Sequence, residues 1–174
     1  GDLDLPGEYI KWDNNKVYAA GNELTGGKEV NIISFEDQQN GRAYYVDNLL
    51  MFSEEPQGKK IERLSATPGS QFLSFFNYLK NSAIYTAATG AIQGVDPGTS
   101  YTFIIPNNAA IAAAVTAGAL PTSNNPTAQN EKDMVADFIR YHILVNKIAS
   151  DDGLTTGQFE TLKKDGLGEK TYAQ

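Results

Sequence analysis

The stretch that begins at residue 101, YTFIIPNNAAIAAAVTAGAL, restricts the possible folds more than any other part of the chain. Its first five residues are β-branched or aromatic and predict a short buried strand, which Pro106 ends because proline cannot donate a hydrogen bond within a sheet. Asn107 or Asn108 can then cap a helix, since an asparagine oxygen accepts from the free amides of a first helical turn. The alanine-rich residues 109–117 favour that helix. The sequence therefore predicts a strand that passes directly into a helix.

A second block with a mixed pattern follows a polar loop at residues 121–130. Within residues 131–141 the apolar side chains fall on one face of a helix, which predicts an amphipathic helix. Tyr141 and His142 lie at the end of that helix, directly before the apolar residues 143–145. An earlier amphipathic helix is predicted at residues 70–81, where phenylalanine and leucine recur at helical spacing.

The N-terminal part of the chain has the pattern of a β-sheet. Residues 8–52 contain four β-rich runs, separated by turn-forming clusters of asparagine, aspartate and glycine. The first two runs flank Asp13-Asn14-Asn15 and predict a hairpin. The last two occupy residues 30–35 and 43–52, with a turn at residues 38–41 between them.

Composition narrows the class of protein. The chain has 174 residues, of which 41% are hydrophobic and 20% charged, enough to bury one good core. Its formal net charge of −7 would be repelled by nucleic acid phosphates, so nucleic acid is not an expected partner. No apolar run approaches the roughly 18 to 20 residues of a membrane helix, and we expect no membrane insertion of this segment.

Two blocks of the sequence resemble the fasciclin-like domain family, in which a hydrophobic strand, a proline, a polar pair and an alanine-rich helix form the first signature. Here that block is residues 102–111, with Pro106 and Asn107 as structural signature positions. The second signature, a helix end that runs into a Tyr-His pair and a strand, is similar to residues 138–148. Ile104-Ile105 and Asn107 replace the residues that are more usual around the proline, which suggests a divergent member.

A third motif resembles the family but stands in an unexpected place. Residues 40–50, NGRAYYVDNLL, look like the closing motif of a fasciclin-like domain, with Asn40 and Gly41 as signature positions in its turn. In the family this motif follows both signature blocks, whereas here it precedes them. The order of the motifs is therefore rotated.

The resemblance implies a division of the chain into three parts. Residues 1–56 are a β-rich segment like the C-terminal part of a fasciclin-like domain, residues 57–67 are a linker, and residues 68–174 are the N-terminal and central part. Within the last part, residues 154–166 resemble the family's short helix-turn, and residues 169–174 the start of a strand. The rotated order fits either a piece of a tandem array or a circularly permuted domain, and we expect the pieces to complete one domain, within one chain or by swapping between two.

The fold class implied by the resemblance is α+β, with a β-sandwich-like core of short strands wedged against several helices. The implied function is that of a noncatalytic adhesion or binding domain, located outside the cell or at its surface, whose partner is a matrix protein, a surface protein or a glycan. Tyr141 and His142 are its candidate binding residues. The alternative is a structural repeat that assembles with neighbouring domains or chains, in which strand exchange brings about self-association.

Catalysis has little chemical basis in this sequence. There is one histidine and no cysteine, which rules out a cysteine nucleophile and a zinc site of several histidine or cysteine ligands. The chain has no GxSxG motif that would supply a serine nucleophile, and His142 lies among apolar residues. The simpler interpretation is that His142 is structural and that its ring bonds a backbone group. The adjacent carboxylates Glu54-Glu55 and Asp151-Asp152 fit no calcium loop. We expect no metal, no cofactor and no enzyme activity.

Aromatic residues offer one further candidate site. Trp12, Tyr9 and Tyr18 flank the first predicted hairpin and could form an exposed platform for stacking against a carbohydrate. Strand aromatics more often pack on their own sheet, which is the alternative interpretation.

Overall fold

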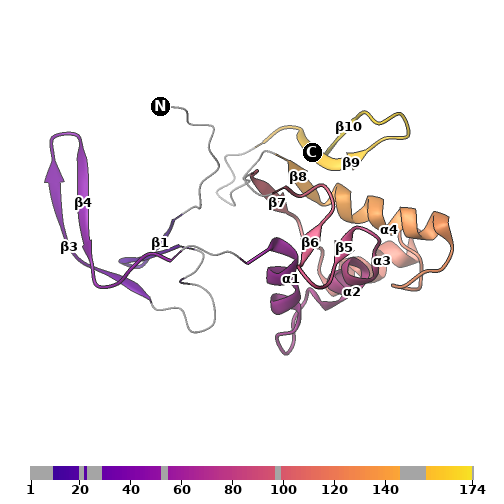
Figure 1. The fold of residues 1–174 in the computed structure, drawn as a ribbon, viewed down its shortest axis with the longest axis horizontal. Coiled ribbons are helices and arrows are strands. Elements are labelled where there is room, and N and C mark those ends of the chain that lie inside the picture. Colours follow the sequence, from indigo (N-terminus) through magenta and orange to yellow (C-terminus); the bar gives the residue numbers. More distant parts are fainter. Residues whose placement is uncertain are drawn as a thin grey trace. The chain divides into compact units, whose positions relative to one another are not determined.

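The computed structural model describes residues 10–19, 22, 29–51, 55–96, 99–145 and 156–173. The chain divides into two compact units, residues 1–55 and residues 56–174. Each unit is described by itself below, with the elements labelled as in Figure 1.

The first unit is an antiparallel sheet in the strand order β1-β2-β3-β4 (Figure 1). Asn14 and Asn15 connect its first two strands with φ angles of 46° and 63°, the left-handed backbone of a two-residue hairpin turn, which asparagine tolerates better than most residues. The four strands predicted within residues 8–52 are confirmed in the described part of the unit. They are β1 (Lys11–Asp13), β2 (Lys16–Tyr18), β3 (Val30–Gln38) and β4 (Gly41–Val46).

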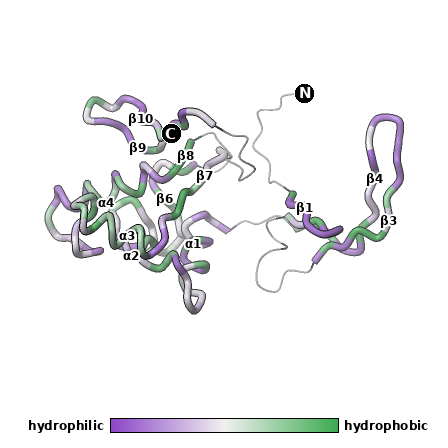
Figure 2. The backbone as a smooth tube through the Cα atoms, turned by 180° about the vertical axis from the view of Figure 1, so that it is seen from behind, coloured by the Kyte–Doolittle hydropathy of each residue, from purple (hydrophilic) through white to green (hydrophobic). Residues whose placement is uncertain are grey.

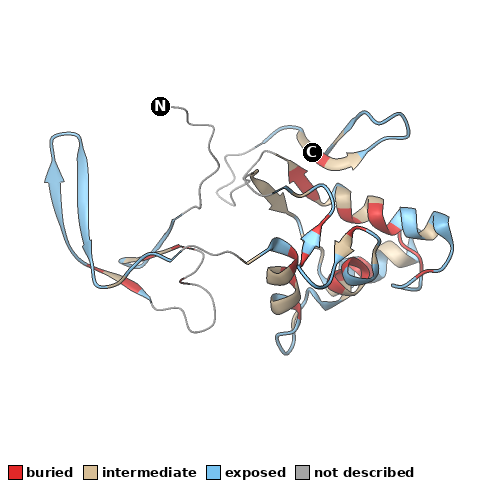
Figure 3. Cartoon of the chain, in the orientation of Figure 1, coloured by how far each residue is buried: buried red, intermediate tan, exposed pale blue. Residues whose placement is uncertain are grey.

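The described residues of the first unit form a small hydrophobic core. It consists of Val17, Val30 and Ile32, and the two residues from β3 lie at the end of the β3–β4 hairpin away from its turn. The rest of the β3–β4 hairpin is exposed over its whole length, as Figure 3 shows. Burial therefore supports only one end of this sheet, and the hairpin presents its side chains to solvent on both faces.

The second unit combines helices with two antiparallel sheets, one in the order β10-β9-β8-β7 and one made of β5 and β6. The α+β class is thus confirmed. The helices are α1 (Gln57–Ser65), α2 (Leu73–Asn81), α3 (Asn108–Thr116) and α4 (Gln129–Tyr141). The strands are β5 (Tyr85–Thr86), β6 (Ala91–Ile92), β7 (Tyr101–Phe103), β8 (Ile143–Val145), β9 (Phe159–Lys164) and β10 (Lys170–Ala173).

The core of the second unit lies between α2, α4 and the strand that follows α4. Phe75 and Leu79 of α2, Val135 and Ile139 of α4, and Ile143 of β8 are all buried within one hydrophobic cluster. Figure 2 shows hydrophobic and hydrophilic residues interspersed along α4, and Figure 3 shows that its buried residues form only part of its surface. This is the amphipathic pattern that the sequence predicts for residues 131–141.

The predicted linker at residues 57–67 is wrong, because residues 57–65 form α1. Ile61 is buried in the main cluster and fixes the helix to the second unit. Lys59 Nζ also bonds Glu62 Oε2 at 2.7 Å, one turn along the helix. The sequence EEPQGKK, residues 54–60, is polar and gives no helical pattern. Ile61, the buried apolar residue of α1, comes directly after it.

The predicted helix-turn at residues 154–166 is also wrong where the structure describes it. Residues 159–164 form β9, which pairs with β8 on one side and β10 on the other. Thr161 is fully buried there, and its hydroxyl lies 2.6 Å from that of Thr171 on β10. Pairing on both sides outweighs the local preference of this segment. The strand predicted at residues 169–174 is present as β10.

Candidate binding surfaces

The Pro106-Asn107-Asn108 corner joins two helices. Asn107 caps its own helix, because its Oδ1 accepts the amide of Ala110 at 2.8 Å. Asn108 acts on the other helix: its Oδ1 accepts the amide of Ser74 in α2 at 2.9 Å, and its Nδ2 donates to the carbonyl of Ser70 at 3.0 Å. The predicted cap is confirmed, and both asparagine side chains are engaged in holding the fold.

His142 makes several contacts within the second unit, through its ring and through its backbone. Its Nδ1 lies 2.8 Å from the carbonyl of Phe138, and because a carbonyl only accepts, Nδ1 carries the proton in this contact. The imidazole lies 4.4 Å from the Phe138 ring and 6.4 Å from the Phe75 ring, measured between centroids. Its backbone carbonyl accepts the amide of Ile104 at 2.9 Å. These contacts describe a residue that joins the end of α4 to the core and to the segment after β7.

Tyr141 differs from its neighbour in being exposed. Its hydroxyl lies 3.5 Å from the carbonyl of Tyr172, at the outer limit of a hydrogen bond. The Tyr141 ring meets the His142 ring edge-on at 6.0 Å. Of the two predicted binding residues, only Tyr141 has a side chain that a partner can reach over a large area.

The predicted platform of Trp12, Tyr9 and Tyr18 is not assembled as the sequence suggests. Trp12 is opposite Val17 in the β1–β2 ladder, and Tyr18 is opposite Lys11. Because neighbours along a strand point to opposite faces, Trp12 and Tyr18 lie on different sides of the sheet. Tyr9 lies outside the described residues.

Trp12 instead gathers with residues of the β3–β4 hairpin. The Trp12 and Tyr44 rings meet edge-on with centroids 4.6 Å apart, and the Phe35 and Tyr44 centroids are 6.1 Å apart. The guanidinium of Arg42 lies over the Phe35 ring, 4.2 Å from its centroid, and makes a two-pronged bond to Asp37. We call Trp12, Phe35 and Tyr44 the aromatic face.

A β-bulge creates the aromatic face. The β3–β4 register shifts between Ile32 and Ser34, so that Ile32 is opposite Val46 while Phe35 is opposite Tyr44. Strict alternation along β3 would put Phe35 and Ile32 on opposite faces, and the shift puts them on the same one. The sequence pattern did not single out Phe35 and Tyr44, although counting outward from a two-residue turn at Gln39 and Asn40 pairs them. The register between β2 and β3, which aligns Trp12 with them, leaves no such signal.

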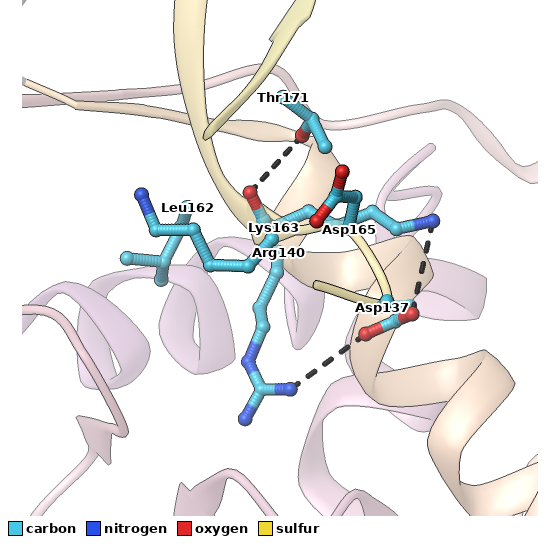
Figure 4. A pocket seen from close by; sticks show the side chains of 8 residues that line it. Asp137, Arg140, Leu162, Lys163, Asp165 and Thr171 are labelled. Atoms are coloured by element: carbon cyan, nitrogen blue, oxygen red, sulfur yellow. Dashed lines mark hydrogen bonds and ion pairs between the residues drawn. The ribbon is translucent and has the colours of Figure 1, made fainter. Parts of the chain in front are cut away.

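A hollow of about 550 Å³ lies between α4 and the β9–β10 hairpin. Figure 4 shows Asp137 and Arg140, from the last turns of α4, beside Lys163 of β9. One oxygen of Asp137 is 3.7 Å from Arg140 Nη1, and the other is 3.7 Å from Lys163 Nζ. None of these residues is a predicted site residue, because Lys163 comes beside α4 only through the pairing of β9 with β8 and β10, which the predicted helix-turn at residues 154–166 does not contain.

Other kinds of site find no support in the described part of the chain. Its residues include no group of three histidine, cysteine or acidic side chains that would hold a metal ion. None of its helices has the length and apolar character needed to cross a membrane.

A family model described as the Fasciclin domain matches residues 70–172. The match covers more than half of the chain, which therefore belongs to the fasciclin domain family. Domains of this family are generally noncatalytic and of the adhesion or binding type. Among curated proteins and among solved structures, the chain has no match.

Proposed function

We propose that this chain is a noncatalytic adhesion module, outside the cell or at its surface, that binds a glycan through the aromatic face. Family membership supports adhesion, and the exposure of the aromatic face carries the choice of ligand. Trp12 and Phe35 are each 52% exposed and Tyr44 40%, although the three rings lie together on one face. Aromatic rings held together in solvent are unusual unless a partner covers them.

The chemistry of this face suits a sugar. Aromatic rings provide flat apolar surface at a small entropic cost, and they can cover the C–H face of a pyranose ring. Arg42, whose guanidinium lies over the Phe35 ring, and Asp37, which it bonds, can donate to and accept from hydroxyl groups. A matrix or surface protein is the alternative partner, which the absence of a response to every sugar would favour.

Trp12 makes the experiment direct, because it is the single tryptophan of the chain. Titration with a panel of neutral and acidic oligosaccharides should change its fluorescence. Tyr44→Ser should weaken binding by about twofold to tenfold, since one aromatic contact contributes about 0.5–1.5 kcal/mol. Tyr45→Ser is the matched control, because Tyr45 is the next residue of β4 and points to the other face.

The outcomes decide whether the aromatic face binds a sugar. A fluorescence response to a sugar that Tyr44→Ser weakens and Tyr45→Ser leaves unchanged supports the proposal. No response to any sugar overturns glycan binding by this face. If Tyr44→Ser and Tyr45→Ser weaken sugar binding equally, binding depends on the β3–β4 hairpin as a whole and not on the aromatic face.

A second candidate function is self-association through the β3–β4 hairpin. Its other face also exposes apolar side chains, with Ile33 at 68% and Tyr45 at 50%, and β4 stands at the end of the strand order among the described strands. Such an edge is a template for pairing with another chain. Strand exchange between copies would also account for the rotated order of the motifs, with one copy supplying the strands that complete the domain of another.

Solution mass by light scattering over a hundredfold range of protein concentration tests this second candidate. An oligomer that dissociates on dilution, and that Ile33→Lys converts to a monomer, supports self-association. A monomeric mass at every concentration overturns it and favours a permuted single domain.

A further inference from the structure

The hollow between α4 and the β9–β10 hairpin has a polar lining with both signs of charge. Its basic side chains come from Arg140, Lys163 and Lys164, and its acidic ones from Asp137 and Asp165. The remaining lining residues are Leu162, Gly166 and Thr171. With Leu162 as its single large apolar contributor, this lining does not suit an apolar ligand, which would need predominantly hydrophobic walls.

Two of these charged groups are committed elsewhere. Lys164 Nζ bonds Glu160 Oε1 at 3.2 Å, on the same strand. Asp165 Oδ1 accepts the amides of Leu167 and Glu169 at 2.9 and 2.8 Å and closes the turn between β9 and β10. Lys164 Nζ and Asp165 Oδ1 therefore already have hydrogen-bond partners, while the charges of the two groups, which are opposite in sign, still act on the hollow.

Arg140 and Lys163 remain as the cations that face the hollow, with Asp137 between them (Figure 4). Both distances to Asp137 are 3.7 Å, which is beyond hydrogen-bonding range. The guanidinium of Arg140 is held in position by its other terminal nitrogen, because Nη2 donates to Gln93 Oε1 at 3.0 Å. Asp137 thus balances the two cations without satisfying their N–H groups.

We propose that this hollow binds the carboxylate of an acidic sugar unit, with Arg140 and Lys163 as its direct contacts. A guanidinium fork matches a carboxylate in shape, and an ammonium adds a second charge-assisted hydrogen bond. The volume of about 550 Å³ is that of a small-molecule site. The hydroxyl groups of a sugar can bond lysine and carboxylate groups alike, which fits a lining of mixed charge.

Asp137 has a defined part in this proposal, as the competitor that the ligand displaces. In the free protein it neutralises the cations, and on binding the ligand carboxylate takes its place beside Arg140 and Lys163. All residues of this site belong to the second unit, so the proposal does not depend on ligand binding by the aromatic face in the first unit.

The test is calorimetric titration of the whole chain carrying Tyr44→Ser, which weakens the aromatic face, with tri-galacturonate and with maltotriose as the neutral sugar. Tri-galacturonate should bind, maltotriose should not, and binding should weaken between 50 and 500 mM salt, because salt screens exposed charges. Arg140→Gln and Lys163→Gln should each weaken binding about tenfold or more, the usual consequence of losing a charge-assisted bond. Lys132→Gln is the matched control: it removes the same charge from an exposed position on the same helix.

The direction of the affinity change in Asp137→Asn tests whether Asp137 competes with the ligand. Removing the competing carboxylate should tighten binding of tri-galacturonate severalfold, an effect that a merely structural role for Asp137 would not produce. Weaker or unchanged binding in Asp137→Asn overturns the competition. An equal loss in Lys132→Gln and Arg140→Gln overturns the site, since it would show a response to net charge alone.

Two further probes test the identity of the ligand. A tri-glutamate peptide carries carboxylates without sugar hydroxyls, and inorganic sulfate carries negative charge alone. Weaker binding of both than of tri-galacturonate supports the proposal. Binding of either one as tightly as tri-galacturonate overturns the assignment to a sugar.

Discussion

Asn108 caps a helix to which it does not belong: its Oδ1 accepts the backbone amide of Ser74, 34 residues earlier in the chain, at 2.9 Å. Helix α2 needs this contact because its own N-cap, Phe72, makes no side-chain cap. Asn107 caps α3 in the same corner. One asparagine pair therefore satisfies the first turns of two helices, which explains why both positions are polar where the chain turns from β7 into α3.

Asn108→Ala should lower the free energy of unfolding by about 1–3 kcal/mol, because it leaves the amide of Ser74 and the carbonyl of Ser70 without partners in a partly buried site. Asn107→Ala should lower it by about 0.5–2 kcal/mol, the usual cost of losing a helix cap. Urea denaturation followed by far-ultraviolet circular dichroism at the helix band measures both losses, since the described helices all lie in the second unit.

Asn108→Asp is the control for this prediction. Its carboxylate still accepts the amide of Ser74 but no longer donates to Ser70, so it should lose less stability than Asn108→Ala. Wild-type stability in Asn108→Ala would show that the cap of α2 contributes nothing measurable.

Gly58 lies at a close contact between α1 and the β5–β6 connection that leaves no room for a Cβ atom. A Cβ at Gly58 would lie 2.3 Å from the carbonyl oxygen of Gly90 and 2.6 Å from the ring of Tyr85, so α1 packs directly on the β5–β6 connection. Glycine to alanine in a helix ordinarily gains about 0.5–1 kcal/mol. Here the clash should reverse the sign and cost about 1–3 kcal/mol.

The same denaturation experiment measures Gly58→Ala against Gly166→Ala, where a Cβ would meet nothing within 4 Å. Gly166→Ala should change the stability by less than about 0.5 kcal/mol. A more stable Gly58→Ala variant would mean that α1 does not depend on this close approach.

The sequence was sufficient to predict the elements whose pattern is local. The strand before Pro106, the cap at Asn107 and the amphipathic helix before Tyr141 each combine a regular period with a clear stop signal. The family resemblance rests on these elements, and the matched region contains them.

The errors arose where a distant partner decides the structure. Residues 57–65 form a helix because Ile61 reaches a core assembled from later elements, and residues 159–164 form a strand because β8 and β10 flank them. The aromatic face depends in the same way on a bulge near Ile32 and on the position of β2 beside β3. A local pattern does not encode these alignments.

His142 should affect stability at least as much as binding. His142→Ala removes the bond to the Phe138 carbonyl and the ring contacts with Phe138 and Phe75, and it should cost about 1–3 kcal/mol of unfolding free energy. Tyr141→Phe is the control, since the 3.5 Å contact of its hydroxyl contributes little, and its effect should stay below about 0.5 kcal/mol. Unchanged unfolding of His142→Ala together with lost ligand binding would instead make His142 a direct ligand contact.

Asp47 should make the first unit sensitive to acid. Its carboxylate accepts the side-chain amide and the backbone amide of Asn31, both at 2.7 Å, and these bonds hold the pKa of Asp47 below its ordinary value of 3.8. A carboxyl group with a lowered folded-state pKa stabilises the fold above its unfolded pKa, and this contribution is lost as the pH falls through the folded pKa. The contact between β3 and the end of β4 should therefore hold at pH 5 and weaken as the pH falls below about 4.

Nuclear magnetic resonance gives both quantities in one titration from pH 6 to pH 2. The carboxyl carbon of Asp47 should titrate with a midpoint below 3.8, and the amide proton of Asn31 should shift with the same midpoint, because it donates to that carboxylate. Asp47→Asn should abolish the acid shift of the Asn31 amide, since an asparagine in its place does not titrate in this range. A midpoint at or above 3.8 would mean that the bonds to Asn31 do not favour the ionised form, and the hairpin would then owe its acid stability to other groups.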